Sequence, residues 1–197
     1  MTGAPPRLIL ASASPRRRQL LTDAGFAFEV VAPETDEILS ANFTIREATC
    51  WNALRKGLTV ARTRPDAVVL AADTLVALEQ QVIGKPADLA EARRILRLLS
   101  GQTHVVATGV FLAHLRRGKS ETFCVLSQVV FKKLSDRMIE EYLATIDPLD
   151  KAGAYAAQGR GRAIIARIVG SRSNVIGLPL EQTRAALARF AIRPHLA

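Results

Sequence analysis

The sequence predicts an α/β protein with a mixed, twisted sheet and flanking helices, because two kinds of segment take turns along its 197 residues. Near-continuous apolar runs such as 67–72 are typical of strands buried on both faces. Other segments repeat apolar residues three and four positions apart, which favours helices that cover a sheet. Two long β-like runs, 103–115 and 121–134, are joined by a short basic turn and predict a hairpin. The hairpin interrupts strict strand–helix–strand alternation, so a Rossmann-type sheet is not expected.

The first half of the chain is expected to alternate strands with helices. The strands expected there lie at 8–11, 28–31, 67–72 and, with a turn, 75–83. A helix is predicted behind Pro15, because proline favours the first helical turn, and it should stop at Gly25. Thr44 and Glu47 form a capping box, which begins a second helix that runs toward Arg62.

The second half is expected to hold three more helices and a late strand. A second capping box, Asp88 with Glu91, begins a helix whose apolar face is Leu89, Ala92, Ile95, Leu96 and Leu99. After the hairpin, a helix at 135–145 is expected to bury Met138, Ile139, Tyr142 and Leu143. A glycine-rich loop, a strand and a final helix are predicted at 147–161, 163–169 and 180–190.

Composition limits the class of protein. Hydrophobic residues make up 49% of the chain and charged residues 23%, as in ordinary globular proteins. No apolar run approaches the ~20 residues of a membrane helix, and residues 1–7 lack a secretory pattern, so we expect a cytoplasmic protein with no membrane partner. The 2 cysteines and 3 separated histidines argue against a disulfide framework and a zinc site.

The net charge of +9 invites a nucleic-acid partner. Most of the 27 basic residues are arginines, however, and they are spread from Arg7 to Arg193. No zinc finger, long basic tail or RNA-binding aromatic motif accompanies them. We therefore expect no nucleic-acid partner and keep that function as the less favoured alternative.

Three arginines, Arg16, Arg17 and Arg18, follow the segment Ser12-Ala13-Ser14-Pro15. Guanidinium groups, hydroxyls and the free backbone N–H groups of a helix start would then meet at one spot. Together these groups make an anion site, most simply one for a phosphate. The alternative is an exposed basic helix start with no ligand.

Asp73 is the strongest single candidate for a catalytic residue. An aspartate at the carboxyl end of a buried strand lies where open α/β sheets hold their ligands, although it could also cap the next turn. The acidic loop with Glu34, Asp36 and Glu37 offers a second carboxylate for a magnesium ion, or is merely solvated. Lys85 carries an ammonium that suits a phosphate.

Gln158 lies in an unusual loop of small residues, 150–159. Its amide both donates and accepts hydrogen bonds, which suits recognition of a nucleobase edge, or it serves only the backbone of a tight loop. Walker A, GxGxxG, GxSxG and HExxH patterns are absent from the sequence, so the candidate chemistry rests on carboxylates and cations.

Six segments occur in a characteristic order along the chain. They are 8–17, Ala72-Asp73-Thr74, Gly84-Lys85-Pro86, Leu99-Ser100-Gly101, 150–155 with Gln158-Gly159, and 174–180. In this order they resemble the Maf family of nucleoside triphosphate pyrophosphatases, from about Leu8 to Leu187. The resemblance implies hydrolysis of a nucleoside triphosphate to the monophosphate and pyrophosphate with a divalent cation, Mg²⁺ or Mn²⁺. It also implies a single domain, 1–197, of two lobes around a cleft, related to inosine triphosphatase, and a homodimer.

The resemblance assigns roles by position. Asp73 matches the catalytic aspartate that activates water, and Asp73 and Glu37 match the acidic positions near the metal. Positions that match substrate-binding residues are Ser12, Arg16, Arg17, Lys85 and, in the second helix, Lys56. Positions that match residues choosing the base are Arg16, Thr74 and Gln158.

The late loop, 152–155 followed by Gln158, resembles the type that acts on dTTP and UTP, so we expect a pyrimidine substrate. Arg160, Arg162 and Arg172 depart from the family pattern, and these extra cations could widen or shift specificity. Two alternatives stay open. One is a pyrophosphatase for 7-methyl-GTP or another base, and the other is a nucleotide-binding regulator of septum formation without turnover.

Overall fold

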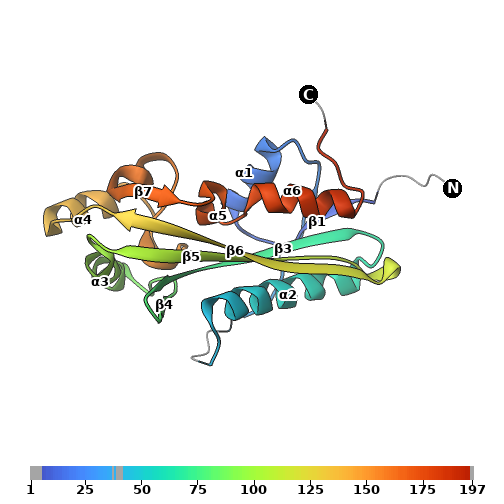
Figure 1. Ribbon diagram of the computed structural model, residues 1–197, viewed down its shortest axis with the longest axis horizontal. Coiled ribbons are helices and arrows are strands. Elements are labelled where there is room, and N and C mark those ends of the chain that lie inside the picture. The colour runs from blue at the N-terminus through green and yellow to red at the C-terminus, as the bar shows by residue number, and fades with distance from the viewer. Residues whose placement is uncertain (1–5, 37, 39–41, 196–197) are drawn as a thin grey trace. The chain divides into compact units, whose positions relative to one another are not determined.

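Seven strands form one mixed sheet in the computed structural model, which describes residues 6–36, 38 and 42–195 (Figure 1). The strands are β1 (Leu8–Leu10), β2 (Glu29–Val30), β3 (Val68–Leu78), β4 (Gln81–Ile83), β5 (Thr103–His114), β6 (Lys119–Phe131) and β7 (Ile165–Val169). Their order is β2-β1-β3-β5-β6-β7, with β4 paired to β3. Because β1 pairs in parallel with β2 and β3 while β4 and β7 pair antiparallel with their neighbours, the predicted mixed sheet is confirmed.

The helices follow the start signals read from the sequence. They are α1 (Pro15–Asp23), α2 (Ile45–Thr63), α3 (Leu89–Leu99), α4 (Asp136–Leu143), α5 (Arg172–Ile176) and α6 (Leu180–Arg189). Thr44 caps α2 with both halves of its capping box formed, and Asp88 caps α3 by accepting from the Glu91 N–H at 2.7 Å. Short 3₁₀ segments occur at η1 (Leu115–Arg117), η2 (Ala152–Ala154) and η3 (Gly159–Ile164). No helix of the described residues combines the length and the apolar character needed to span a bilayer.

The chain divides into two compact units. Unit 1 comprises the segments 1–73, 108–125 and 177–197, and unit 2 comprises 74–107 and 126–176. The divisions fall inside β3, β5 and β6, so each of these long strands contributes residues to both units.

Unit 1 is built around the first βαβ segment. In Figure 1, α2 lies on one side of the strands, and α1 and α6 lie on the other. The fit of α2 is close because Gly57 has no side chain: a Cβ there would lie 2.3 Å from Cδ1 of Phe111. At Gly109 on β5, a Cβ would lie 2.4 Å from the carbonyl carbon of Thr49. Two glycines therefore set how near α2 comes to the sheet.

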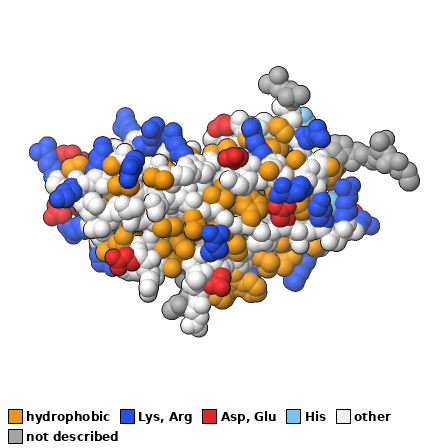
Figure 2. Space-filling model, in the orientation of Figure 1, with side chains coloured by type: hydrophobic (Ala, Val, Ile, Leu, Met, Phe, Trp, Pro, Cys, Tyr) orange, Lys and Arg blue, Asp and Glu red, His pale blue; other side chains and the backbone are white. Residues whose placement is uncertain are grey.

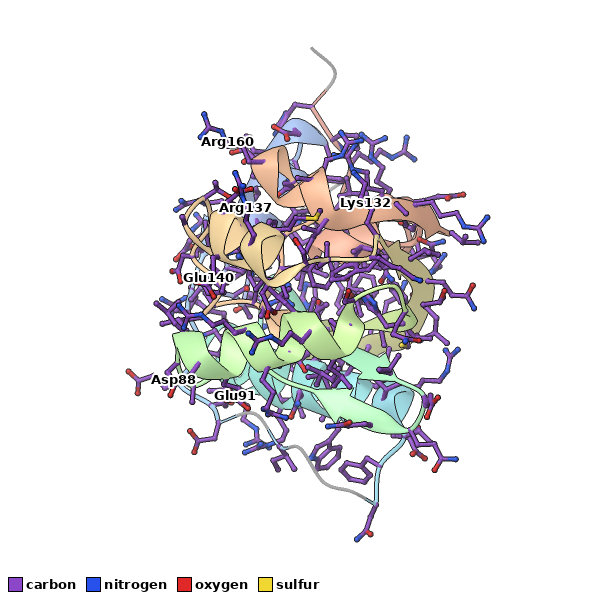
Figure 3. The ribbon with its side chains drawn as sticks, turned by 90° about the vertical axis from the view of Figure 1, so that its left-hand side faces the viewer. Asp88, Glu91, Lys132, Arg137, Glu140 and Arg160 are labelled. Carbon is purple, nitrogen blue, oxygen red and sulfur yellow. The ribbon has the colours of Figure 1, made fainter. Side chains whose placement is uncertain are left out.

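Unit 2 has its own core between α3, α4 and the strands. Three buried rings, His104, Phe131 and Tyr155, meet edge to face with centroids 4.8–5.3 Å apart. On the outside, α3 and α4 are joined by ion pairs between Arg93 and Glu140 and between Arg97 and Asp136. Figure 3 looks onto these two helices, with Asp88 and Glu91 at the start of α3 and Arg137 and Glu140 on α4.

Several local predictions need correction. β3 does not end at Asp73 but continues to Leu78, because its second part gains a new partner: Val76 pairs with Ile83 of β4. Leu89 and Met138, predicted to face the core, are exposed at the first turns of α3 and α4. The late glycine-rich loop contains η2 and the start of η3, and α5 was not predicted. The hairpin of β5 and β6 is confirmed.

Candidate functional site

Asp73 lies in the middle of β3 and is only 2% exposed. Within unit 1, β1 runs parallel to β3 with Leu10 opposite Leu70, and the Ala11 N–H donates to the Leu70 carbonyl at 2.8 Å. The register with β1 stops there, three residues before Asp73. Ser12 follows β1, and Asp73 follows the part of β3 that pairs with β1. Both residues therefore lie at the carboxyl end of this parallel pair, where α/β sheets hold their ligands.

Two side chains from α2 hold the Asp73 carboxylate. Lys56 Nζ lies 2.6 Å from Oδ1, and Asn52 Nδ2 donates to Oδ2 at 3.1 Å. Asn52 and Lys56 are four residues apart, so they share one face of the helix. The ion pair is nearly dry: the Lys56 and Asp73 side chains are 12% and 3% exposed. Each carboxylate oxygen thus has one fixed donor.

Asn52 is a functional candidate that the sequence reading missed. Besides holding Asp73, its amide accepts from the Ile38 N–H at 2.9 Å and donates to the Ile38 carbonyl at 3.1 Å. One buried side chain therefore connects Asp73 to the loop before α2. The only signals in the sequence are a polar amide inside a helix, where asparagine is disfavoured, and its spacing of four from Lys56.

The predicted phosphate segment forms a small hydrogen-bonded network. The Ser12 hydroxyl oxygen accepts from Ser14 N at 3.2 Å and from Arg17 Nη1 at 3.3 Å. Arg17 Nε also donates to the Gly177 carbonyl at 2.8 Å, which ties the start of α1 to the segment before α6. A hydroxyl has two lone pairs and one proton, so Ser12 keeps its O–H to donate to an incoming anion. Arg16, the second residue of α1, is half-buried.

In unit 2, the segments that carry Thr74, Lys85 and Gln158 pack on one another. Gly84, next to Lys85, follows the strand paired with Val76, two residues after Thr74. The Gly153 N–H donates to the Gly84 carbonyl at 3.1 Å, and Gly153, at φ +75°, lies against Val76. A side chain there would be strained and crowded, so glycine is required where the loop crosses the strand.

Two buried tyrosines fix the loop around Gln158. Tyr142 accepts from the Ala156 N–H and donates to the Gly161 carbonyl, both at 3.1 Å. The Tyr155 hydroxyl lies 2.9 Å from His104 Nε2. Burial raises the pKa of Tyr142 to about 12 and lowers that of His104 to about 4, so both groups are neutral at pH 7. Gln158 is thus presented by a loop anchored on both sides.

The structure describes two of the three acidic residues of the predicted loop, Glu34 and Asp36. Glu37 lies outside the described residues, and Glu34 and Asp36 are exposed. Within the described part of the chain, no three His, Cys, Asp or Glu side chains gather in a way that could hold a metal. Asp73 nevertheless fits a cation bound mainly by phosphate oxygens, because each of its oxygens has a second lone pair beside the one used by Lys56 or Asn52.

Basic side chains are spread over the face drawn in Figure 2 and do not form one continuous stripe. Many are paired, as in Arg116 with Asp66 and Arg189 with Glu121. These paired cations are therefore neutralised locally by the carboxylates that they contact.

The chain is similar to known proteins over almost its whole length. The family model described as Maf-like protein matches residues 7–190. A dTTP/UTP pyrophosphatase of Bacillus pumilus is 42% identical over 188 residues, which cover 95% of this chain and 98% of that protein. Proteins of the same name from Bacillus cereus and Bacillus cytotoxicus are 41% and 42% identical, covering 94% and 93% of this chain and 91% and 95% of theirs. The chain belongs to the Maf family.

Proposed function

We propose that this protein hydrolyses dTTP and UTP to the nucleoside monophosphate and pyrophosphate. The observation that carries the proposal is the buried Asp73 carboxylate, held on one oxygen by Lys56 and on the other by Asn52. A buried carboxylate that is held in one orientation is a suitable general base. The names of the similar Bacillus proteins supply the substrate and the reaction.

In the proposed reaction, a water molecule attacks the α-phosphorus. Asp73 takes the proton of the water as its oxygen forms the new bond to phosphorus. The bond between the α-phosphorus and the bridging oxygen breaks, and pyrophosphate leaves with the electron pair. Lys56 and Asn52 act as positioning residues, because they contact Asp73 and fix its oxygens.

The remaining predicted residues supply charge and recognition. Ser12 donates its free O–H to a phosphate oxygen, and Arg16, Arg17 and Lys85 neutralise the triphosphate. Arg16, Thr74 and Gln158 select the base, with the fixed Gln158 loop as support for that role. A divalent cation, Mg²⁺ or Mn²⁺, would be held by Asp73 and, as the resemblance implies, Glu37, and would supply charge neutralisation at the phosphates. Such substrates would be cytoplasmic metabolites. Self-association into a homodimer is a separate prediction, which light scattering would test.

The test is release of pyrophosphate, measured against orthophosphate, from dTTP, UTP, CTP, GTP and 7-methyl-GTP with magnesium. We expect pyrophosphate chiefly from dTTP and UTP. Asp73→Asn should lower turnover at least about 100-fold, the range of a lost general base, while a nucleotide still binds. Asp66→Asn, which removes an exposed carboxylate in the same unit, is the matched control.

Other outcomes separate the alternatives. Pyrophosphate mainly from 7-methyl-GTP would keep the reaction and reject the pyrimidine assignment. Binding of dTTP without turnover in the unmodified protein would support the nucleotide-binding regulator. Near-normal turnover of Asp73→Asn would remove Asp73 from the role of base.

A further inference from the structure

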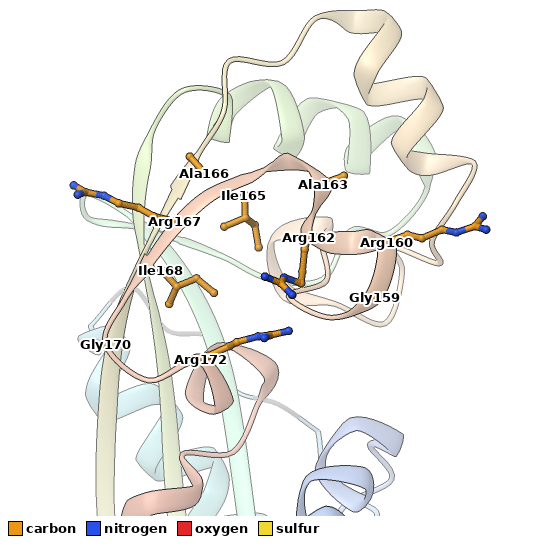
Figure 4. A pocket seen from close by; sticks show the side chains of 10 residues that line it. All are labelled: Gly159, Arg160, Arg162, Ala163, Ile165, Ala166, Arg167, Ile168, Gly170 and Arg172. Carbon is orange, nitrogen blue, oxygen red and sulfur yellow. The ribbon is translucent and has the colours of Figure 1, made fainter.

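A hollow of about 580 Å³ lies in unit 2, and its lining begins at Gly159, the residue after Gln158 (Figure 4). It is formed by η3, the edge strand β7 and the start of α5. Four of its ten lining residues are arginines, namely Arg160, Arg162, Arg167 and Arg172, and none of the ten is an Asp or Glu. A volume of this size is typical of a small-molecule site.

The arginine side chains of the hollow differ from other arginines in unit 2. Arg93, Arg94, Arg97 and Arg137 each form an ion pair with a carboxylate. Among the described residues, the four guanidinium groups of the hollow make neither an ion pair nor a side-chain hydrogen bond. Like charges gathered at one place repel, so this arrangement favours occupation by an anion.

Two of the four arginine side chains point into the hollow. In Figure 4, Arg162 from η3 and Arg172 from α5 both extend into the space, whereas Arg160 and Arg167 extend outward on either side. Ile165 and Ile168 form an apolar wall. Two converging guanidinium groups can engage several oxygens of one ligand at once, which is the geometry in which arginine binds phosphates best.

Protection of a sheet edge does not explain this cluster. β7 ends the strand order and has an open edge, and a charged residue such as Arg167 would discourage another strand from pairing there. Arg162 and Arg172 lie outside β7, on the segments before and after it. They are the two whose side chains point into the hollow. Edge protection therefore accounts for Arg167 but does not account for this central pair.

We propose that this hollow binds an oligophosphate, meaning a diphosphate or triphosphate chain, either free or as part of a nucleotide. A single-stranded nucleic acid is disfavoured, because none of the lining residues offers an aromatic ring on which a base could stack. The proposal stands on the hollow and its cations and does not depend on the hydrolytic activity. Pyrophosphate, the product of the proposed reaction, is one member of this ligand class.

The test is calorimetric titration of the full-length protein with inorganic triphosphate in the presence of EDTA. Two binding events are expected, one in the hollow and one at the proposed phosphate residues of the substrate site. The double variant Arg162→Gln/Arg172→Gln should lose one event. The control Arg94→Gln/Arg137→Gln removes the same number of exposed charges from the same unit and should keep both, with affinities within about twofold.

Identical isotherms for the two double variants would overturn the proposal. Loss of both events in Arg162→Gln/Arg172→Gln, with an unchanged circular dichroism melt, would also overturn it as a separate site. Failure of the proposed function is distinguishable, since absence of dTTP hydrolysis would leave the calorimetric difference between the variants intact.

A second titration identifies the source of the phosphate chain. Non-hydrolysing Asp73→Asn protein is titrated with dTTP, with and without the Arg162→Gln/Arg172→Gln pair. If the hollow takes nucleotides, the pair removes one of two dTTP events. If it takes only free oligophosphate, dTTP binds once in both proteins, and inorganic triphosphate still binds twice in the protein with intact arginines.

Discussion

Lys56 and Asp73 form a nearly dry ion pair, with 2.6 Å between Nζ and Oδ1, that joins the middle of α2 to the middle of β3. Removal of one partner of a buried pair leaves the other charge without compensation. We expect Lys56→Met to lower the free energy of unfolding by about 3 kcal/mol and to abolish most turnover. Urea unfolding and pyrophosphate release measure the two effects. Arg62→Met, an exposed change on the same helix, is the control, and equal stability of the two variants would contradict this account.

Asn52 is expected to act on the rate through Asp73. Asn52→Ala removes the donor to Oδ2 and both hydrogen bonds to Ile38. Turnover should fall about tenfold or more while KM changes little, because the misaligned group takes part in the chemical step and not in binding. Steady-state kinetics with dTTP provide the two constants. A purely structural role would instead show as lower stability at unchanged kcat, and Thr59→Ala on the exposed side of α2 gives the baseline.

The secondary structure was more predictable than the site. The capping box at Thr44, the N-cap Asp88 and the apolar run before Asp73 follow from local chemistry, and they placed the starts of α2 and α3 and the first part of β3 correctly. The continuation of β3 depends on its pairing with β4, which is not visible in the run itself. Asn52 was missed because its importance comes from two partners, 14 and 21 residues away, that only the folded chain brings together.

His104 should make stability depend on pH. Burial lowers its pKa from 6.5 to about 4 in the folded protein, so the folded state resists protonation that the unfolded state accepts. The stabilisation is complete above pH 6.5 and is lost as the pH falls toward 4, by about 3 kcal/mol in total. Urea unfolding between pH 7 and 4 measures it. In His104→Gln this part of the slope should vanish, and an unchanged slope would assign it to other groups.

Cys124 should be the reactive thiol of the two cysteines. The neighbouring Cys50 thiol lowers the pKa of the Cys124 thiol below its usual range, and Thr49 Oγ1 lies 3.6 Å from the same sulfur. Because the thiolate reacts, alkylation of Cys124 by iodoacetamide should rise at a lower pH than alkylation of Cys50. Mass spectrometry of digested protein follows both sites. Cys50→Ala should move the rise at Cys124 to higher pH, and no movement would contradict the role assigned to Cys50.

The two glycines at the contact between α2 and the sheet leave no room there for a side chain. Gly109 meets α2 at Thr49, Gly57 meets Phe111, and both residues that hold Asp73 lie between these points of contact. A single added methyl group at either glycine would push the helix outward and carry Asn52 and Lys56 with it. The alignment of the carboxylate therefore depends on the backbone clearance between α2 and β5.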